Sequence, residues 1–414
     1  MPILRRLGDQ PPPDEEPLPG PRLSPLVPGR SGRPSFSLEA LRERVERQFY
    51  EETAGRADIL AELDSEASQR AALREIAGYV FAVEAVSPTA ADRQTILDRA
   101  HANLFGFGPL EELLRDETVT AISIGGAGDV RLRRGAGPLQ SAPARFDDGA
   151  HLATILRRIV AQADATLSDL TPFVEAGVTL RGRRARVSAI CPPLSSTPSA
   201  EIRLHPSRPL TLDDLAARGA LPPAGIALLH AIIAAGHGLL IAGEAGTGKT
   251  TLAGALLPTL AGQIAAVERA AELSLPPEAA RFSPAPPTPD QPGVDFAALI
   301  GASLATTPDW LVIDEIGEDD APALWTALAA DPAPRCLWTL REEARLHQAI
   351  ATRLPFVAAL ARTGDSLRLA LLAEWSAAGG QLALRPLLAV EGEGWALARQ
   401  GSAHPLDLPP GLWG

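Results

Sequence analysis

Cysteines and aromatic residues are scarce in this chain. Its 414 residues include only two cysteines, Cys191 and Cys336, which lie far apart without metal-ligand spacing. A disulfide framework is therefore excluded, and the composition favours a reducing cytoplasm. Aromatic residues make up 4% of the chain and hydrophobic residues 46%. The cores must consequently be packed mainly from aliphatic side chains.

An excess of positive charge and paired histidines are also lacking. The formal net charge is −12, which argues against a general nucleic-acid binder, because affinity for phosphates needs many Lys and Arg side chains. The seven histidines form no pair at helical or hairpin spacing. No metal site is expected beyond a magnesium ion bound with a nucleotide.

The N-terminal sequence has no apolar core and no small-residue cleavage site, so no signal peptide is predicted. Residues 1–35 are rich in Pro, Gly and Arg and are expected to form a disordered arm. The most apolar window, 224–242, contains His230, Gly236 and His237. It is better explained as a buried helix, a turn and a strand than as a membrane span.

The patterns predict three folded parts. A helical region covers 36–103, with Ser37 as its first cap and helices at 68–86 and 90–103. An α+β sensor-like domain covers 104–205, with strands at 118–124, 130–134, 178–190 and 200–205. A linker with one short helix covers 206–222, and a P-loop α/β domain covers 223–414.

The stretch GEAGTGKT, residues 243–250, follows an apolar strand and opens into a helix. This context is typical of a phosphate-binding P-loop, whose glycines let backbone N–H groups face the β-phosphate. Lys249 is expected to reach the β and γ oxygens, and Thr250 to ligate Mg²⁺. The predicted loop contacts are Gly243, Glu244, Ala245, Gly246, Thr247, Gly248, Lys249, Thr250 and Thr251.

A second motif, which is acidic, follows the apolar run 310–313. Asp314 is expected to hold Mg²⁺ at the end of a strand beside the P-loop strand, and Glu315 to orient or deprotonate the attacking water. Glu268 and Glu272 lie between the two motifs, where a strand edge can bring a carboxylate towards the γ-phosphate. Taken alone, these two are better explained as surface charge.

Four arginines lie close together at 181, 183, 184 and 186. Without interleaved aromatic residues, a solvated hairpin edge is a better explanation for them than a nucleic-acid site. Arg203 lies on the last predicted strand before the linker.

Several stretches follow one another in a characteristic order: FGFGPLEELLRDETVTAISIGG, RARVSAICPPLS, AEIR, PLTLDDLAARG, GEAGTGKTTL, VERAAELSL and PDWLVIDEIG. In this order they resemble the traffic ATPases of type II and type IV secretion and pilus assembly. The tight-adherence pilus branch is the most similar, and the resemblance covers about residues 90–340. It implies a RecA-like ATPase domain, ATP and Mg²⁺ as cofactors, a homo-hexameric ring and an inner-membrane platform partner. It also implies nucleotide contacts from Arg203 and Arg186, an acidic box at Glu268 and Glu272, and catalysis by Glu315 together with Lys249 and Glu268.

The sequence departs from the family pattern at several coupling positions. Arg269 replaces the usual Asp of the acidic box, Ala305 and Thr307 replace arginines before the second motif, and Gly317 replaces another arginine. The histidine box is reduced to RCLWTLREEA, with Arg341 in place of its histidine. Losing one arginine that stabilises transition-state charge can cost about 10³-fold in rate.

The sequence thus favours a ring-forming ATPase of a secretion or pilus system, with reduced turnover. It would be cytoplasmic, or peripheral at the inner membrane through its partners. The alternative is a non-hydrolytic, nucleotide-gated scaffold of such a system. A DNA-translocating motor is disfavoured by the acidic charge balance.

Overall fold

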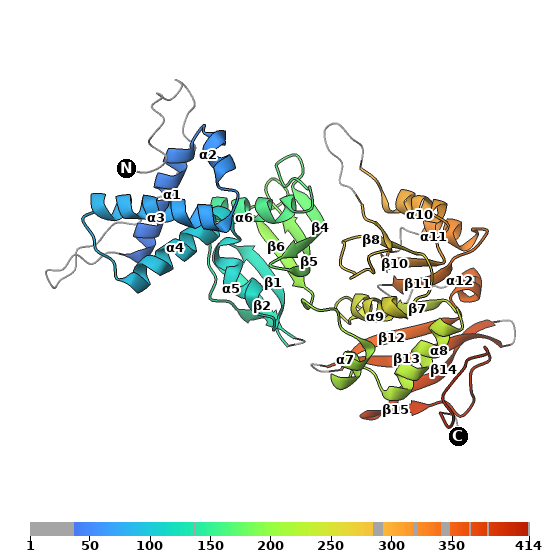
Figure 1. Cartoon of the computed structure of the whole chain (residues 1–414). Coiled ribbons are helices and arrows are strands. Elements are labelled where there is room, and N and C mark those ends of the chain that lie inside the picture. The colour runs from blue at the N-terminus through green and yellow to red at the C-terminus, as the bar shows by residue number, and fades with distance from the viewer. Residues whose placement is uncertain are drawn as a thin grey trace.

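The structure is a computed structural model that describes residues 37–135, 137–284, 293–317, 321–340, 348–363, 366–378 and 381–412. The predicted arm at 1–35 lies outside these residues. Along the chain, a helical region is followed by an antiparallel sheet and then by a larger mixed sheet (Figure 1).

The helical region contains α1 (Leu38–Thr53), α2 (Ala57–Glu62), α3 (Glu66–Val83) and α4 (Ala90–Phe105). The Ser37 hydroxyl accepts the Ala40 N–H, as an N-cap does, and apolar residues three or four apart bury Leu41, Val45 and Phe49. Buried Arg42 of α1 donates to Asp147 at 2.9 Å. This ion pair links the helices to the sheet that follows.

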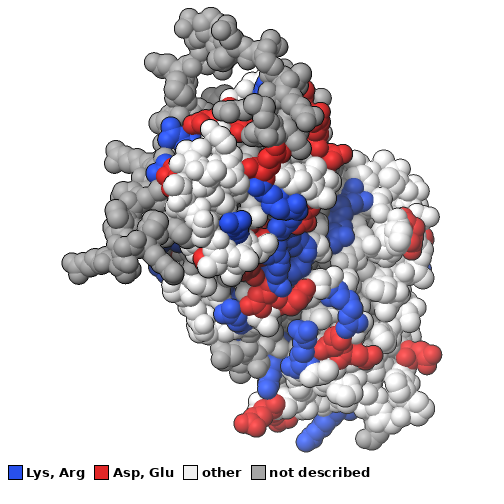
Figure 2. Space-filling view, turned by 60° about the vertical axis from the view of Figure 1, so that its left-hand side comes forward, with Lys and Arg blue, Asp and Glu red and all other residues white. Residues whose placement is uncertain are grey.

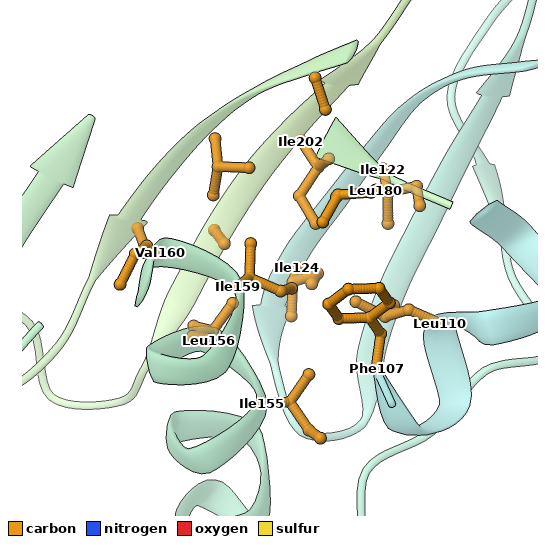
Figure 3. Close-up of a cluster of buried hydrophobic side chains, with 14 of the residues drawn as sticks. Phe107, Leu110, Ile122, Ile124, Ile155, Leu156, Ile159, Val160, Leu180 and Ile202 are labelled. Carbon is orange, nitrogen blue, oxygen red and sulfur yellow. The ribbon is translucent and has the colours of Figure 1, made fainter. Parts of the chain in front are cut away.

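The N-terminal sheet has the strand order β3-β2-β1-β6-β5-β4 and is antiparallel throughout. Its strands are β1 (Val119–Gly126), β2 (Asp129–Arg134), β3 (Gln140–Ser141), β4 (Phe173–Leu180), β5 (Arg183–Ile190) and β6 (Ser199–Leu204). The short helices η2 (Gly108–Leu110) and α5 (Glu111–Arg115) precede it, and α6 (Gly149–Ala161) lies within it in sequence. Figure 3 shows Ile155, Leu156 and Ile159 of α6 packed towards Ile122, Ile124 and Ile202 of the strands.

The opposite face of this sheet is polar. Arg133, Ala121, Arg203, Arg186 and Gly177 lie in one row across five strands, because each is in register with the next. Strand alternation gives one covered and one polar face, as is common for antiparallel sheets. In Figure 2, basic and acidic residues gather in a band on one face of the molecule.

Helix α7 (Leu212–Ala217) lies in the predicted linker and joins the sheet to the C-terminal domain. Its N-cap Thr211 and Asp214 form a reciprocal capping box. The boundary predicted after residue 103 falls in the last turn of α4.

The C-terminal sheet has the order β15-β14-β13-β12-β7-β11-β10-β8-β9. Six neighbouring strands are parallel, namely β7 (Leu239–Ala242), β8 (Ile264–Glu268), β9 (Ala280–Phe282), β10 (Trp310–Ile316), β11 (Arg335–Leu340) and β12 (Phe356–Thr363). The antiparallel strands β13 (Ser366–Ala378), β14 (Gln381–Glu391) and β15 (Gly394–Leu397) extend it beyond β12. This is the predicted α/β architecture with a RecA-like P-loop domain.

Helices cover both faces of the parallel strands. On one face, α8 (Pro223–Ala234) and α9 (Lys249–Leu256) pack on Leu239, Ile241 and Val312. On the other, α10 (Phe296–Ala305) and α11 (Ala321–Leu328) pack on Leu240 and Leu311. Each parallel strand is therefore buried on two faces, which explains its continuous apolar sequence. α12 (Gln348–Arg353) precedes β12.

One expectation about strand order is wrong. The strand that ends in Asp314 was expected beside the P-loop strand, but β11 pairs with both β7 and β10 and separates them. The apolar sequence of each strand is the same wherever it lies in the sheet, so composition does not indicate its neighbours. This insertion brings Thr339 of β11 to the site described next.

Candidate nucleotide site

The P-loop joins β7 to α9 through glycines in conformations that other residues rarely adopt. Gly248, the residue before α9, has φ +91°, and Gly246 has φ +77°. A Cβ on Gly243 would lie 2.6 Å from the Leu360 carbonyl oxygen, so the neighbouring strand β12 leaves no room for a side chain. Arg362 of β12 also donates to the Gly246 carbonyl at 3.3 Å. β12 thus helps to shape the loop, which the sequence did not indicate.

Lys249 is the only lysine of the chain, although Lys and Arg together number 38. Its ammonium donates to the carbonyl oxygens of Gly243 at 2.9 Å and Glu244 at 2.8 Å. The Thr247 hydroxyl donates to the same Glu244 carbonyl at 2.8 Å. A compact ammonium with three donors is therefore placed inside the loop, whereas all the other Lys and Arg side chains of the chain are guanidinium groups.

Asp314 is buried, with 2% of its surface exposed, and it accepts two hydroxyl groups. Thr250 donates to it at 2.9 Å and Thr339 at 2.6 Å. Burial raises the pKa of Asp314 to about 6, although these hydrogen bonds oppose the shift. Thr339 was predicted only as part of a strand; a hydroxyl in the otherwise apolar run CLWTL was the available signal.

Glu315 has an unusual backbone for a side chain of its size, with φ +62°. Three contacts hold it there: its N–H donates to the Thr339 hydroxyl at 2.7 Å, its carbonyl accepts from Arg269 at 3.0 Å, and its carboxylate pairs with Arg186. Left-handed conformations cost energy and persist where several contacts enforce them, often at functional sites. Arg269 also lies over the Phe296 ring, 4.4 Å from its centroid.

Glu268, the predicted catalytic carboxylate of the acidic box, lies in register with Asp314. It is fully buried at the end of β8, pairs with Arg281 at 2.5 Å and accepts the Leu273 N–H at 2.7 Å. Burial raises its pKa to about 7. These partners occupy both carboxylate oxygens, and a catalytic role for Glu268 stays a prediction.

Glu272 is buried as well and contacts His205, with the Oε1 and Nε2 atoms 3.1 Å apart. The interpretation of Glu268 and Glu272 as surface charge, made without the resemblance, is therefore wrong. The end of β8 and the turn after it direct both carboxylates inwards, which spacing along the sequence does not indicate.

The interpretation of the four arginines as a solvated hairpin edge is also wrong. β5 lies between β6 and β4, and Arg183 is buried, donating to the carbonyls of His205, Asp116 and Val119. Arg184 donates to the Ala271 carbonyl of the C-terminal domain at 3.3 Å. The alternating sequence placed these arginines on strands but could not indicate what covers them.

Arg203 and Arg186 were both expected near the nucleotide. Arg186 reaches Glu315, whereas Arg203 is 43% exposed and donates to Glu201 of its own strand at 2.9 Å. The described contacts do not join Arg203 to the loop, so its role stays a prediction. Arg341, which replaces the box histidine, lies outside the described residues.

Thr250 and Asp314 are the residues that fit a magnesium ion. Their side-chain oxygens are 2.9 Å apart beside the P-loop, and a hydroxyl with one carboxylate is the donor set that Mg²⁺ uses when phosphates and waters complete its shell. Within the described residues, no group of three or more His, Cys, Asp or Glu could hold a metal by itself. No described helix has the length and apolarity needed to cross a bilayer.

Fold and site together define a RecA-like P-loop protein. The pattern of the "Type II/IV secretion system protein" family matches residues 103–331, more than half of the chain. The chain therefore belongs to this family of secretion ATPases, and membership implies nucleotide binding.

Two curated relatives are conjugal transfer proteins by name. One, provisionally so named, is from Mycobacterium tuberculosis (strain ATCC 25618 / H37Rv) and is 31% identical over 234 residues, 54% of this chain and 66% of the relative. The other, TrbB of Rhizobium radiobacter, is 25% identical over 221 residues, 52% of this chain and 65% of the relative. The chain thus spans slightly less than two thirds of each.

Solved structures with similar folds include two secretion and pilus proteins. The VirB11 ATPase of the Brucella suis type IV secretion system shares 19% identity at a TM-score of 0.29, covering 68% of this chain and 96% of that one. The pilus retraction motor PilT shares 14% identity at a TM-score of 0.43, covering 68% and 82%.

Proposed function

We propose that this protein binds MgATP at the P-loop and hydrolyses it as the ring motor of a secretion, conjugation or pilus-assembly system. The observation that supports this most is the joint placement of Lys249 inside the loop and of Thr250 against Asp314. Bound magnesium would supply charge neutralisation for the phosphates. The chain's own Lys249, Thr250 and Asp314 would hold the nucleotide, and Glu315 would orient the attacking water.

Family membership supports the wider setting of this proposal. We infer a cytoplasmic homo-hexamer that acts at the inner membrane through a membrane-embedded platform protein. Mass in solution, measured with and without MgATP, tests the ring. A monomer under every condition would contradict it.

The single lysine allows a sharp test of the nucleotide site. An amine-reactive reagent can label only Lys249 and the N-terminal amine, so MgATP should protect one of two labelled positions. Phosphate release should fall about 10²-fold or more in Lys249→Ala, because a positioned charge on the phosphates is lost. The matched control is Arg131→Gln, which removes a cation from an exposed pair with Asp129. Equal rates in wild type and Lys249→Ala would contradict hydrolysis at the P-loop.

A second function, a nucleotide-gated scaffold without turnover, is favoured by one observation. The Glu315 carboxylate is paired with Arg186 of the N-terminal sheet, which neutralises the group proposed to activate water. ATP binding without phosphate release, even with the membrane partner present, would select the scaffold. DNA that raised turnover with a steep salt dependence would instead support a DNA-translocating motor.

A further inference from the structure

Glu315 is shared between the two domains. It belongs to β10 of the C-terminal domain, but its carboxylate pairs with Arg186 of β5 in the N-terminal sheet. Figure 1 shows β4 and β5 on the side of that sheet nearest to β8. The side chains of Arg186 and Glu315 are 13% and 19% exposed, so solvent screens this pair less than a surface pair.

The surrounding contacts hold the two domains together at this point. Gly177 lies opposite Arg186 on β4, and a Cβ there would be 2.3 Å from the Ala271 nitrogen. Arg184, on the same face of β5, donates to the Ala271 carbonyl, and His205 contacts Glu272. Backbone therefore meets backbone beside the ion pair, and the glycine is what permits it.

The donors of Arg186 are divided between two carboxylates. Its Nε donates to Glu175 Oε1 at 2.5 Å, its Nη2 also pairs with Glu175, and its Nη1 pairs with Glu315. Glu175 lies on the neighbouring strand β4 and keeps the guanidinium on the N-terminal sheet. The bond through Nη1 is the one that crosses between domains.

This crossing bond lies next to the candidate phosphate site. Glu315 directly follows Asp314, which accepts the Thr250 hydroxyl in the first turn of α9. A terminal phosphate near Thr250 would present several anionic oxygens to the same guanidinium, and arginine binds phosphate and carboxylate by the same geometry. The two anions would therefore compete for Nη1.

We propose that the Arg186–Glu315 pair is a latch that the γ-phosphate of ATP opens by competing for Arg186. While the pair persists, the carboxylate of Glu315 is neutralised and turned to the N-terminal domain, so it does not orient water. ATP releases it, whereas ADP, which lacks the γ-phosphate, does not. Arg186 thus contacts the γ-phosphate and, through the same guanidinium, also sets the position of Glu315. This inference rests on the proposed MgATP site.

A double-mutant cycle on nucleotide affinity tests the latch without requiring turnover. The dissociation constants of the β,γ-imido analogue of ATP and of ADP are measured by calorimetry for the full chain, Glu315→Gln, Arg186→Gln and the double variant. We expect Glu315→Gln to tighten analogue binding about tenfold when Arg186 is present and less than about twofold when it is Gln. ADP affinity should change less than about twofold in both backgrounds.

Controls separate the latch from folding and from simple repulsion. Arg131→Gln, on the same sheet face, should leave both constants unchanged, and thermal melting verifies that each variant folds. Arg186→Lys keeps the charge without the planar fork and should give an intermediate coupling. Equal tightening by Glu315→Gln in both Arg186 backgrounds, or for ADP as much as for the analogue, would overturn the latch. A wild-type chain that binds neither nucleotide would overturn the proposed function itself.

Discussion

Two buried carboxylates stand side by side in the C-terminal sheet and differ in their partners. Asp314 of β10 and Glu268 of β8 are in register at the ends of adjacent parallel strands. Glu268 pairs with Arg281, whereas Asp314 accepts hydroxyl groups from Thr250 and Thr339. Hydroxyls stabilise a carboxylate without cancelling its charge, so Asp314 remains able to bind a cation. The partners, rather than the place at a strand end, decide which of the two fits a metal.

The largest expected effect comes from removing the charge of Asp314. Asp314→Asn keeps the shape and an acceptor oxygen, so the melting temperature should change little, but phosphate release should fall about 10²-fold or more.

In the wild type, magnesium-dependent binding should weaken below pH 6, because the carboxyl group of Asp314, with a pKa of about 6, gains a proton there. Phosphate-release assays and calorimetry across pH 5–8 measure both effects. An Asn variant with wild-type turnover would remove the distinction between the two carboxylates.

A smaller effect is expected from Glu268, and it concerns stability. Its folded pKa of about 7 lies above the unfolded value of about 4.3, so the native state keeps the proton to higher pH. Stability from this group is therefore greatest below pH 4.3 and is lost as pH rises to about 7. Compared with Glu268→Gln, the wild type should lose up to about 3 kcal/mol of unfolding free energy over that range. Denaturant titrations at pH 4.5, 6 and 8 measure it.

The variant Glu268→Gln is its own control, because Glu46 and Asp314 also have raised pKa values and remain in both proteins. The difference between the two curves isolates Glu268. A difference that stays constant from pH 4.5 to 8 would mean that Arg281 keeps this carboxylate charged throughout, and Glu268 would then resemble an ordinary ion pair.

The smallest expected effect comes from the contact between domains. In Gly177→Val the new side chain meets the backbone of Ala270 and Ala271, and the strain should cost about 1–3 kcal/mol. Amide hydrogen exchange at 269–272 should accelerate as the domains separate. Gly126→Val is the matched control, since a Cβ at that glycine of the same sheet meets nothing within 4 Å. Equal exchange in the two variants would show that this contact does not hold the domains together.

The motifs whose chemistry is local were predictable from the sequence. The strand, glycine turn and helix of residues 238–257 follow one another in the chain, so the order of elements that defines a P-loop can be recognised without distant residues. The Ser37 cap and the strand CLWTL are of the same kind, and the structure has both. The α/β class followed because period and composition are also local properties.

The interpretations that failed depend on residues far apart in the chain. The interpretation of Glu268 as surface charge failed because Arg281 reaches back to it. The interpretation of the arginines as a solvated edge failed because β5 pairs with β6 and Arg184 contacts the C-terminal domain. The insertion of β11 between β7 and β10 could not be inferred, since all three strands are equally apolar. Thr339 was overlooked because its role depends on β11 lying between these two strands.

The sequence alone determined that this chain has a phosphate loop with one lysine, followed by an acidic strand end, because each is a contiguous pattern with its own geometry. Tertiary structure alone decided how Glu315 is held. Its amide bonds to Thr339, its carbonyl to Arg269 and its carboxylate to Arg186, which lie 24, 46 and 129 residues away in sequence. The packing of the two domains brings these groups together, and no local sequence pattern indicates these contacts.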